Sequence, residues 1–370
     1  MSPVVKTTLI IASILVASGL LLMAIAACLP RGAFPFFSSD DFTQQTYEFD
    51  PARLTALSAS TSWRDIELIA DDTQAGKVVY SENEDHKVTV DLSETGTLTI
   101  STQKKKNFFN FLFFFSPPKE HSTVKIYISS QAIERLTLTS LSGDITGTDI
   151  HCGRAEITST SGDIVLSKMT ADTLKTASTS GDVSVLADIE STASVKTTSG
   201  DIVCTDSRCG DLTLSSTSGD VTVRNITVMQ SFHAESTSGD VETDRLTAKD
   251  ISLSATSGDI SLSGAETDTV SASSHSGDVT LKSVRVSQKT YAKTTSGSLY
   301  VDELAGGEDI ELHSVSGSVR GTLAGKAEDY RVSASSTSGK VSAPLSSSGK
   351  YRLEARTTSG SISISFTEKS

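Results

Sequence analysis

The sequence lacks the residue patterns on which most catalytic and metal sites depend. Its 370 residues contain no phosphate-binding loop, no HExxH pattern, no nucleophile elbow and no dinucleotide-binding fingerprint. The 6 histidines are scattered, and the 4 cysteines form neither a CxxC pair nor a Cys/His quartet, so we expect no structural zinc site. These absences predict a protein that is not an enzyme and carries no cofactor.

Aromatic residues and clustered positive charges are also scarce. Phe, Trp and Tyr make up 6% of the chain, and the formal net charge is −13, with Asp and Glu spread along the sequence. Nucleic-acid binding requires clustered Lys and Arg to meet the phosphate backbone, so nucleic acid is excluded as a partner. Such a composition could suit a disordered chain, but Val, Ile and Leu recur with a strict period that disorder does not require. The sequence therefore predicts a folded β protein with small side chains.

Residues 7–27 form an uncharged apolar run, and no comparable run follows it. As a helix this run would be roughly 30 Å long, enough to span a bilayer. It could be a retained signal-anchor, or a lipoprotein signal ending at Cys28, because residues 25–28 resemble a lipobox. Both interpretations assign residues 1–28 to membrane targeting and place the bulk of the chain outside the cytoplasm. Residues 29–50, with their prolines and an aspartate cluster, read as a linker.

Between residues 51 and 140, short runs of alternating apolar and polar residues are separated by polar turns. Two of these runs are Lys87–Leu92 and Thr97–Ile100, with Glu94–Gly96 as the turn between them. Alternation with a period of two residues is typical of a half-buried antiparallel sheet. We therefore expect an N-terminal region of short antiparallel strands over residues 51–140.

One insertion interrupts this region at residues 104–119. It begins with lysines and contains Phe108, Phe109, Phe111, Phe113, Phe114 and Phe115. One interpretation is a pair of strands packed on the first sheet. The other is an exposed loop that enters the membrane interface or contacts a partner, because aromatic residues beside lysines suit the headgroup region. A large exposed apolar patch without such a role would promote aggregation.

The rest of the chain, residues 141–370, is a tandem repeat of Thr-Ser-Gly-Asp-Ile and close variants. The repeat glycines lie 19 to 22 residues apart, a period typical of a solenoid in which each repeat forms one coil. Glycine adopts a positive φ without steric cost, so we expect it to turn the chain at a corner of the coil. The glycines are Gly143, Gly162, Gly181, Gly200, Gly219, Gly239, Gly258, Gly277, Gly297, Gly317, Gly339 and Gly360.

Every repeat has an aliphatic residue two positions after its glycine, from Ile145 to Ile362. Strands this short cannot bury a face alone. Stacking the strands of successive coils in parallel, about 4.8 Å apart, would align their aliphatic side chains in inward columns. We therefore predict an all-β fold, a β-solenoid (β-helix-like) of about 11–12 coils of 19–22 residues, preceded by the antiparallel region and the membrane helix.

Aspartate follows the glycine in eight successive repeats, and these carboxylates should form a column. Neighbouring charges in such a column repel each other by about 1 kcal/mol per pair in water. Hydrogen bonds to backbone amides and water could offset the repulsion. A ladder of cations is the alternative, with Ca²⁺ the best candidate because it binds carboxylate and carbonyl oxygens. The candidate ligands are Asp144, Asp163, Asp182, Asp201, Asp220, Asp240, Asp259 and Asp278.

The membrane segment, the short-stranded region and twelve Thr-Ser-Gly-Asp-Ile/Val repeats together resemble the toastrack, or putative adhesin, family of bacterial envelope proteins. The resemblance covers about residues 51–370. It implies a β-solenoid exposed outside the membrane, in a family linked to envelope stress sensing and surface adhesion, with no catalytic residues to transfer. The Phe-rich insertion departs from the family pattern.

We therefore expect a non-enzymatic, membrane-anchored cell-envelope protein that presents its solenoid surface to an envelope protein or a glycan. Two other functions stay open. A polysaccharide-active β-helix enzyme would need long loops with clustered Asp, Arg or Lys, whereas these repeats are uniform and poor in loops. A passive structural spacer would need nothing beyond the stack itself.

Overall fold

The computed structural model describes residues 42–84, 86–104 and 123–367. The expected membrane helix at 7–27, Cys28 and the phenylalanines of the insertion lie outside these residues. The chain divides into two compact units, residues 1–43 and 44–370, and the second holds every strand from β2 onwards. No helix among the described residues combines the length and the apolarity needed to cross a membrane.

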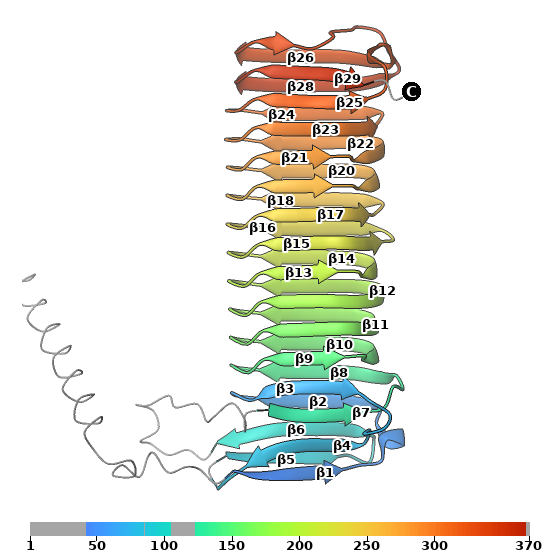
Figure 1. Cartoon of the computed structure of the whole chain (residues 1–370), viewed down its shortest axis with the longest axis vertical. Coiled ribbons are helices and arrows are strands. Elements are labelled where there is room, and N and C mark those ends of the chain that lie inside the picture. The colour runs from blue at the N-terminus through green and yellow to red at the C-terminus, as the bar shows by residue number, and fades with distance from the viewer. Residues whose placement is uncertain (1–41, 85, 105–122, 368–370) are drawn as a thin grey trace, which may run out of the picture. The chain divides into compact units, whose positions relative to one another are not determined.

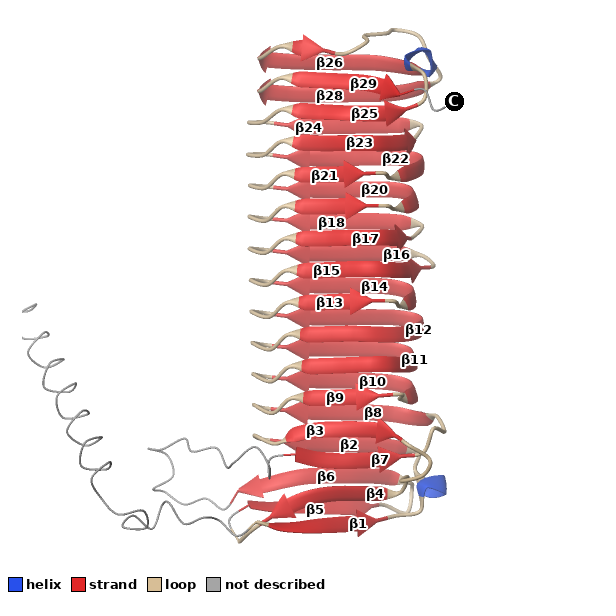
Figure 2. Ribbon diagram, viewed as in Figure 1, coloured by secondary structure: helices blue, strands red, loops and turns tan. Residues whose placement is uncertain are grey.

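Strands of successive coils lie side by side and build one tall stack, which confirms the predicted solenoid (Figures 1 and 2). The pairing between coils is parallel and follows the repeat, as Val221 pairs with Ile202 below it and Val241 above it. The strands in the body of the stack are β8 (Ile133–Ser140), β9 (Ile145–Thr148), β10 (His151–Ser159), β11 (Ile164–Ser178), β12 (Val183–Thr197), β13 (Ile202–Thr205), β14 (Arg208–Ser216), β15 (Val221–Val228), β16 (Ser231–Ser236), β17 (Val241–Thr247), β18 (Asp250–Ala255), β19 (Ile260–Ser263), β20 (Glu266–Ser274), β21 (Val279–Lys282), β22 (Arg285–Thr294), β23 (Leu299–Gly306), β24 (Asp309–Ser314) and β25 (Val319–Ala324).

The core consists of the inward columns that the periodicity predicted. The aliphatic residue two positions after each repeat glycine is at most 1% exposed in eleven coils, from Ile145 to Ile362. Val341 alone in this series is only partly buried, because its coil is the outermost one at that end of the stack. Each buried Val, Leu or Ile contributes roughly 1.5–3 kcal/mol, so a coil with several inward aliphatics is stable only when neighbours cover it.

Each coil has two broad faces and one narrow side. The first face carries the strands that follow the repeat glycine, such as β9, and the second face carries those that precede the next glycine, such as β10. The narrow side joins them near residues 150–153, and the strands β11 and β12 run continuously around it. A left-handed residue begins the narrow side in most coils. The residues with positive φ at this corner are Asp149, Lys168, Asp206, Asn225, Arg245, Gly264, Ser283 and Glu303.

The N-terminal region was predicted as an antiparallel sheet, but most of its strand pairs are parallel. The strands β2 and β3 pair in parallel with β8 and β9, so they form a further coil of the stack. On their other side, β6 and β7 also pair with them in parallel. The hairpin of β5 and β6 is antiparallel as expected, and so is the pair of β4 and β7. The elements are β1 (Thr43–Glu48), a 3-10 helix (Pro51–Arg53), β2 (Ala56–Thr61), β3 (Asp65–Ala70), β4 (Lys77–Glu82), β5 (His86–Leu92), β6 (Thr97–Lys104) and β7 (Thr123–Ile128).

At both ends of the stack the order of coils in space departs from their order in the chain. The coil β6–β7 follows β2–β3 in the sequence and precedes β8–β9. In the stack, however, β2–β3 lies between the other two. At the other end β28 lies between β24 and β26, and β29 lies between β25 and β27. The elements at this end are a 3-10 helix (Ala327–Asp329), β26 (Tyr330–Ser338), β27 (Val341–Ser342), β28 (Tyr351–Ser359) and β29 (Ile362–Thr367).

Candidate functional site

The glycine corner depends on close backbone stacking. None of the twelve repeat glycines has a positive φ, so the prediction that this corner needs glycine for a positive φ is wrong. A Cβ atom on Gly219 would lie 1.9 Å from the carbonyl oxygen of Gly200 in the neighbouring coil, and the other repeat glycines are equally confined, at 1.9–2.2 Å from a backbone oxygen. A real Cβ cannot approach that closely, so the residue must be glycine for successive coils to stack.

A buried column of hydroxyl groups supports this corner, and sequence reasoning missed it. The residue three positions before the glycine is a Ser or Thr, and its hydroxyl oxygen accepts a hydrogen bond from the N–H of that glycine at 2.8–3.1 Å. In most coils it also donates to a glycine carbonyl of the neighbouring coil, at 2.7–3.2 Å. Ala255 interrupts the column. All the remaining repeats carry Ser or Thr at this position, so the sequence did contain the signal.

The predicted aspartate column exists, and hydrogen bonds hold it. Each carboxylate accepts the backbone N–H of the next residue in the column at 2.7–2.9 Å, and the last of these donors is the N–H of Ser298, which binds Asp278. A hydrogen bond to a charged acceptor is worth at least as much as the roughly 1 kcal/mol repulsion between neighbours in water, so the column is stable without a counterion. The described residues contain no group of three or more His, Cys, Asp or Glu arranged to hold a metal ion. Cation binding along this column stays a prediction.

The column starts one coil earlier than the repeats indicate. Asp65 accepts the N–H of Asp144 at 3.0 Å, in a coil where Arg64 takes the place of glycine. The guanidinium of Arg64 lies 4.5 Å from the ring of Trp63, and burial lowers its pKa to about 10. Without the glycine, the sequence offered no sign that residues 61–66 repeat the corner.

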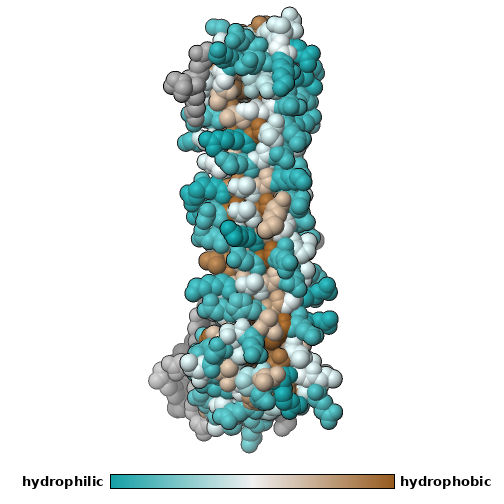
Figure 3. Space-filling model, turned by 90° about the vertical axis from the view of Figure 1, so that its right-hand side faces the viewer, coloured by the Kyte–Doolittle hydropathy of each residue, from teal (hydrophilic) through white to brown (hydrophobic). Residues whose placement is uncertain are grey.

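Two adjoining depressions lie near the N-terminal end of the stack, where the narrow side meets the second face. The first has a volume of about 640 Å³ and the second about 560 Å³, and Asp172 lines both. Figure 3 views the narrow side, where a strip of apolar residues runs between polar rims. The second depression is lined by the buried residues Cys152, Ala171 and Ile189 and by Met229, which is 65% exposed.

The charges in the first depression are arranged in two columns. Arg135 and Arg154 are partners across the parallel pair β8 and β10. Beside them stand Glu134 and Asp172, with Gly153 between their strands. The mixture of guanidinium and carboxylate groups suits hydrogen bonding to a polar ligand. The sequence does not single out any of these residues, since they lie outside the repeat motif.

The buried thiols offer no nucleophile. Burial raises the pKa of Cys152 and of Cys204 to about 12, and that of Cys209 to about 11. All three are free thiols. Because the reactive form is the thiolate, these side chains stay protonated and inert near neutral pH.

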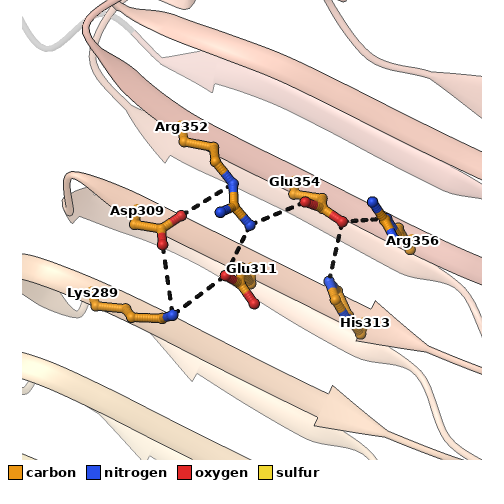
Figure 4. Close-up of polar contacts among 7 residues, drawn as sticks. All are labelled: Lys289, Asp309, Glu311, His313, Arg352, Glu354 and Arg356. Atoms are coloured by element: carbon orange, nitrogen blue, oxygen red, sulfur yellow. Dashed lines mark hydrogen bonds and ion pairs between the residues drawn. The ribbon is translucent and has the colours of Figure 1, made fainter.

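An ion-pair cluster on the second face joins three strands near the C-terminal end (Figure 4). Arg352 of β28 binds Asp309 and Glu311 of β24 at 3.4 and 2.8 Å, and Glu354 on its own strand at 3.0 Å. Lys289 of β22 binds Asp309 and Glu311 from the other side at 3.6 and 3.3 Å. The ion pairs of this cluster therefore tie the inserted strand β28 to β24.

The chain is similar to a known protein family and to several solved structures. The profile of the Toastrack DUF4097 family matches residues 54–245 and 242–370. No curated protein matches the chain. Among solved structures, a putative adhesin from Bacteroides fragilis NCTC 9343 is 12% identical with a TM-score of 0.26, and the match covers 88% of this chain and 97% of that one.

Two further solved structures are similar at the same level. A putative adhesin from Parabacteroides merdae ATCC 43184 is 11% identical with a TM-score of 0.25, covering 88% of this chain and 96% of that one. A putative cell adhesion protein from Clostridium sporogenes ATCC 15579 is 11% identical with a TM-score of 0.19, covering 88% and 100%. Scores this low give no basis for transferring a function. The family profile, in contrast, spans nearly the whole described solenoid, and the chain belongs to the Toastrack DUF4097 family.

Proposed function

We propose that the protein is a non-enzymatic, adhesin-like protein of the cell envelope, anchored by its N-terminal segment, which presents the solenoid surface to a partner or glycan outside the cytoplasm. The observation that carries the proposal is the regular stack of rigid coils, whose outward side chains are mostly small and polar. A backbone fixed by parallel pairing holds such side chains at constant spacing, so many weak contacts can be made at once with little further loss of entropy.

The chemistry of the described residues supports a binding role over catalysis. The thiols are buried and protonated, the aspartate column is occupied with backbone hydrogen bonds, and the acids and bases of the C-terminal cluster neutralise one another. The two depressions are open and shallow enough for a surface ligand, and both lie on a rigid sheet.

The test is to express the full chain in a non-adherent bacterial host. Antibodies against the solenoid should label intact cells, and these cells should attach to glycan- or protein-coated surfaces more than cells with the empty vector. Removal of residues 1–28 should abolish the labelling. Labelling only after the cells are permeabilised would contradict the location, and equal attachment of both cell types would contradict the binding role.

A passive spacer is distinguished by removing two whole coils, residues 220–258, which joins Gly219 to Asp259 and preserves the corner pattern. A spacer would keep its function in proportion to its shortened length. A binding surface confined to the N-terminal coils would keep full affinity, whereas one spread over the stack would lose affinity.

A further inference from the structure

We infer that the first depression, lined by Thr55, Thr97, Glu134, Arg135, Arg154 and Asp172, binds a carbohydrate that bears a carboxylate, such as a uronic acid residue. This inference rests on the proposed function and names the ligand class of one surface within it. It starts from two arginines that the fold forces together.

Arg135 and Arg154 occupy the same position on adjacent parallel strands. Their Cα atoms are therefore about 4.8 Å apart, and like charges placed directly opposite each other in a sheet are destabilising. Neither side chain makes an ion pair or a hydrogen bond with any residue that the structure describes. On β10, the strand of Arg154, Glu156 is bound to Lys175 Nζ at 2.9 Å, and that lysine, more than the charge of Arg154, lowers the pKa of Glu156.

A second pair of arginines lies at the C-terminal end of the same face, and one of the two is bound by acids. Arg352 and Arg331 are also partners across adjacent strands. There, Asp309 and Glu311 of the next coil bind the Arg352 guanidinium, as Figure 4 shows. At the position that corresponds to Asp309, the neighbours of the first pair are Ala56 and Thr173, which carry no charge. An anion between Arg135 and Arg154 would supply the missing partner.

The surroundings of the pair indicate what the rest of the ligand is. Ala56 and Gly153 have little or no side chain where they line the depression, and its volume of about 640 Å³ lies within the range of small-molecule sites. The hydroxyls of Thr55, Thr97 and Thr173 line it, and they both donate and accept hydrogen bonds.

The two carboxylates select against a densely anionic polymer. Glu134 and Asp172 line the same depression as the arginines, so the lining carries no net charge. A polyphosphate or nucleic acid would meet both acids as well as the overall charge of −13. The carboxylate of an acidic sugar can instead accept bidentate hydrogen bonds from the guanidinium groups, while the ring hydroxyls of the sugar donate to Glu134 and Asp172.

The experiment measures binding of uronic acid oligosaccharides to the full chain in detergent by calorimetry. The comparison ligands are the neutral oligosaccharides with the same linkages and sodium acetate. We expect the uronate oligosaccharide to bind at least about 10-fold more tightly than either, because only it satisfies both the arginines and the acids. Arg154→Gln and Arg135→Gln should each weaken it by about 10-fold or more.

The matched control is Arg320→Gln, an exposed arginine on the first face with no ion pair among the described residues. It should leave the affinity unchanged, and all three variants should keep the wild-type thermal unfolding. Equal binding of the acidic and neutral sugars, unaltered binding by the Arg135/Arg154 double variant, or no binding of the uronate at millimolar concentration would each overturn the inference. If one of these outcomes is found but cells that express the full chain still attach, the inference about the ligand fails and the proposed function stands.

Discussion

Replacing Ala255 by serine should stabilise the protein, because it fills the one gap in the hydroxyl column between Ser236 and Ser274. Ala255 pairs with both residues in register. Ser236 accepts the N–H of its glycine at 2.9 Å, and Ser274 donates to the carbonyl of Gly258 at 2.9 Å. At Ala255 the N–H of Gly258 and the carbonyl of Gly239 lack these partners. A serine hydroxyl can supply both hydrogen bonds in one rotamer.

Each new hydrogen bond is worth about 0.5–1.5 kcal/mol net, and one serine rotamer must be fixed. We therefore expect Ala255→Ser to raise the free energy of unfolding by about 1–2 kcal/mol. Urea denaturation gives the global value. Because repeat proteins can unfold coil by coil, hydrogen exchange of the Gly258 amide gives the local one, and it should slow by about 10-fold.

The control is Ala272→Ser, which places a hydroxyl in a fully buried aliphatic column and should lower the stability by about 1–3 kcal/mol. A decrease in stability for Ala255→Ser, or an unchanged exchange rate at Gly258, would refute the reasoning about the column.

Substitutions at four other positions test separate parts of the corner and the core. Gly219→Ala should cost more than about 3 kcal/mol in denaturant unfolding, because its Cβ would lie 1.9 Å from a backbone oxygen; a loss below 1 kcal/mol would mean that the coils separate easily. Asp201→Ala should lower the stability by about 1 kcal/mol, whereas Asp201→Asn keeps the acceptor, relieves repulsion and should match the wild type at low salt; equal losses would point to the charge itself. Thr176→Val should raise the free energy of unfolding by about 1 kcal/mol, and with it the melting temperature, because the buried Thr176 hydroxyl has no hydrogen-bond partner among the described residues. A lower melting temperature would contradict this. Arg245→Gly should stabilise by about 0.5 kcal/mol, the balance between relief of a left-handed φ of 53° and the greater chain entropy of glycine, and destabilisation would show that the Arg245 side chain contributes more than its backbone costs.

The period of the repeat was enough to predict the coils and their inward columns. A buried aliphatic residue two positions after each glycine requires stacking, and the structure places Val221 and its equivalents where the periodicity predicts. The role of glycine was predicted wrongly, since the sequence cannot distinguish a glycine needed for φ from one needed for close approach. Both demands occur in this fold, at different corners of the coil.

The order of the coils was beyond sequence reasoning. The segments with Gly339 and Gly360 carry the same corner pattern, so either could stack on the coil of Gly317. The arginine opposite Asp309 does not distinguish them, because Arg331 of β26 lies in the same register as Arg352 of β28. The paired arginines of the first depression were missed for a related reason, as residues 135 and 154 become neighbours only once the register is fixed.

The insertion of β28 and β29 beneath β26 and β27 has a consequence for biosynthesis. The coil β26–β27 leaves the ribosome before the coil on which it finally rests. A nascent chain that stacks each coil as it emerges would first place β26–β27 on β24–β25, and would then have to release it to admit β28–β29. Maturation of this end therefore requires either a delay in docking or a late rearrangement, and a chain stalled near residue 350 would hold a different, prematurely closed end.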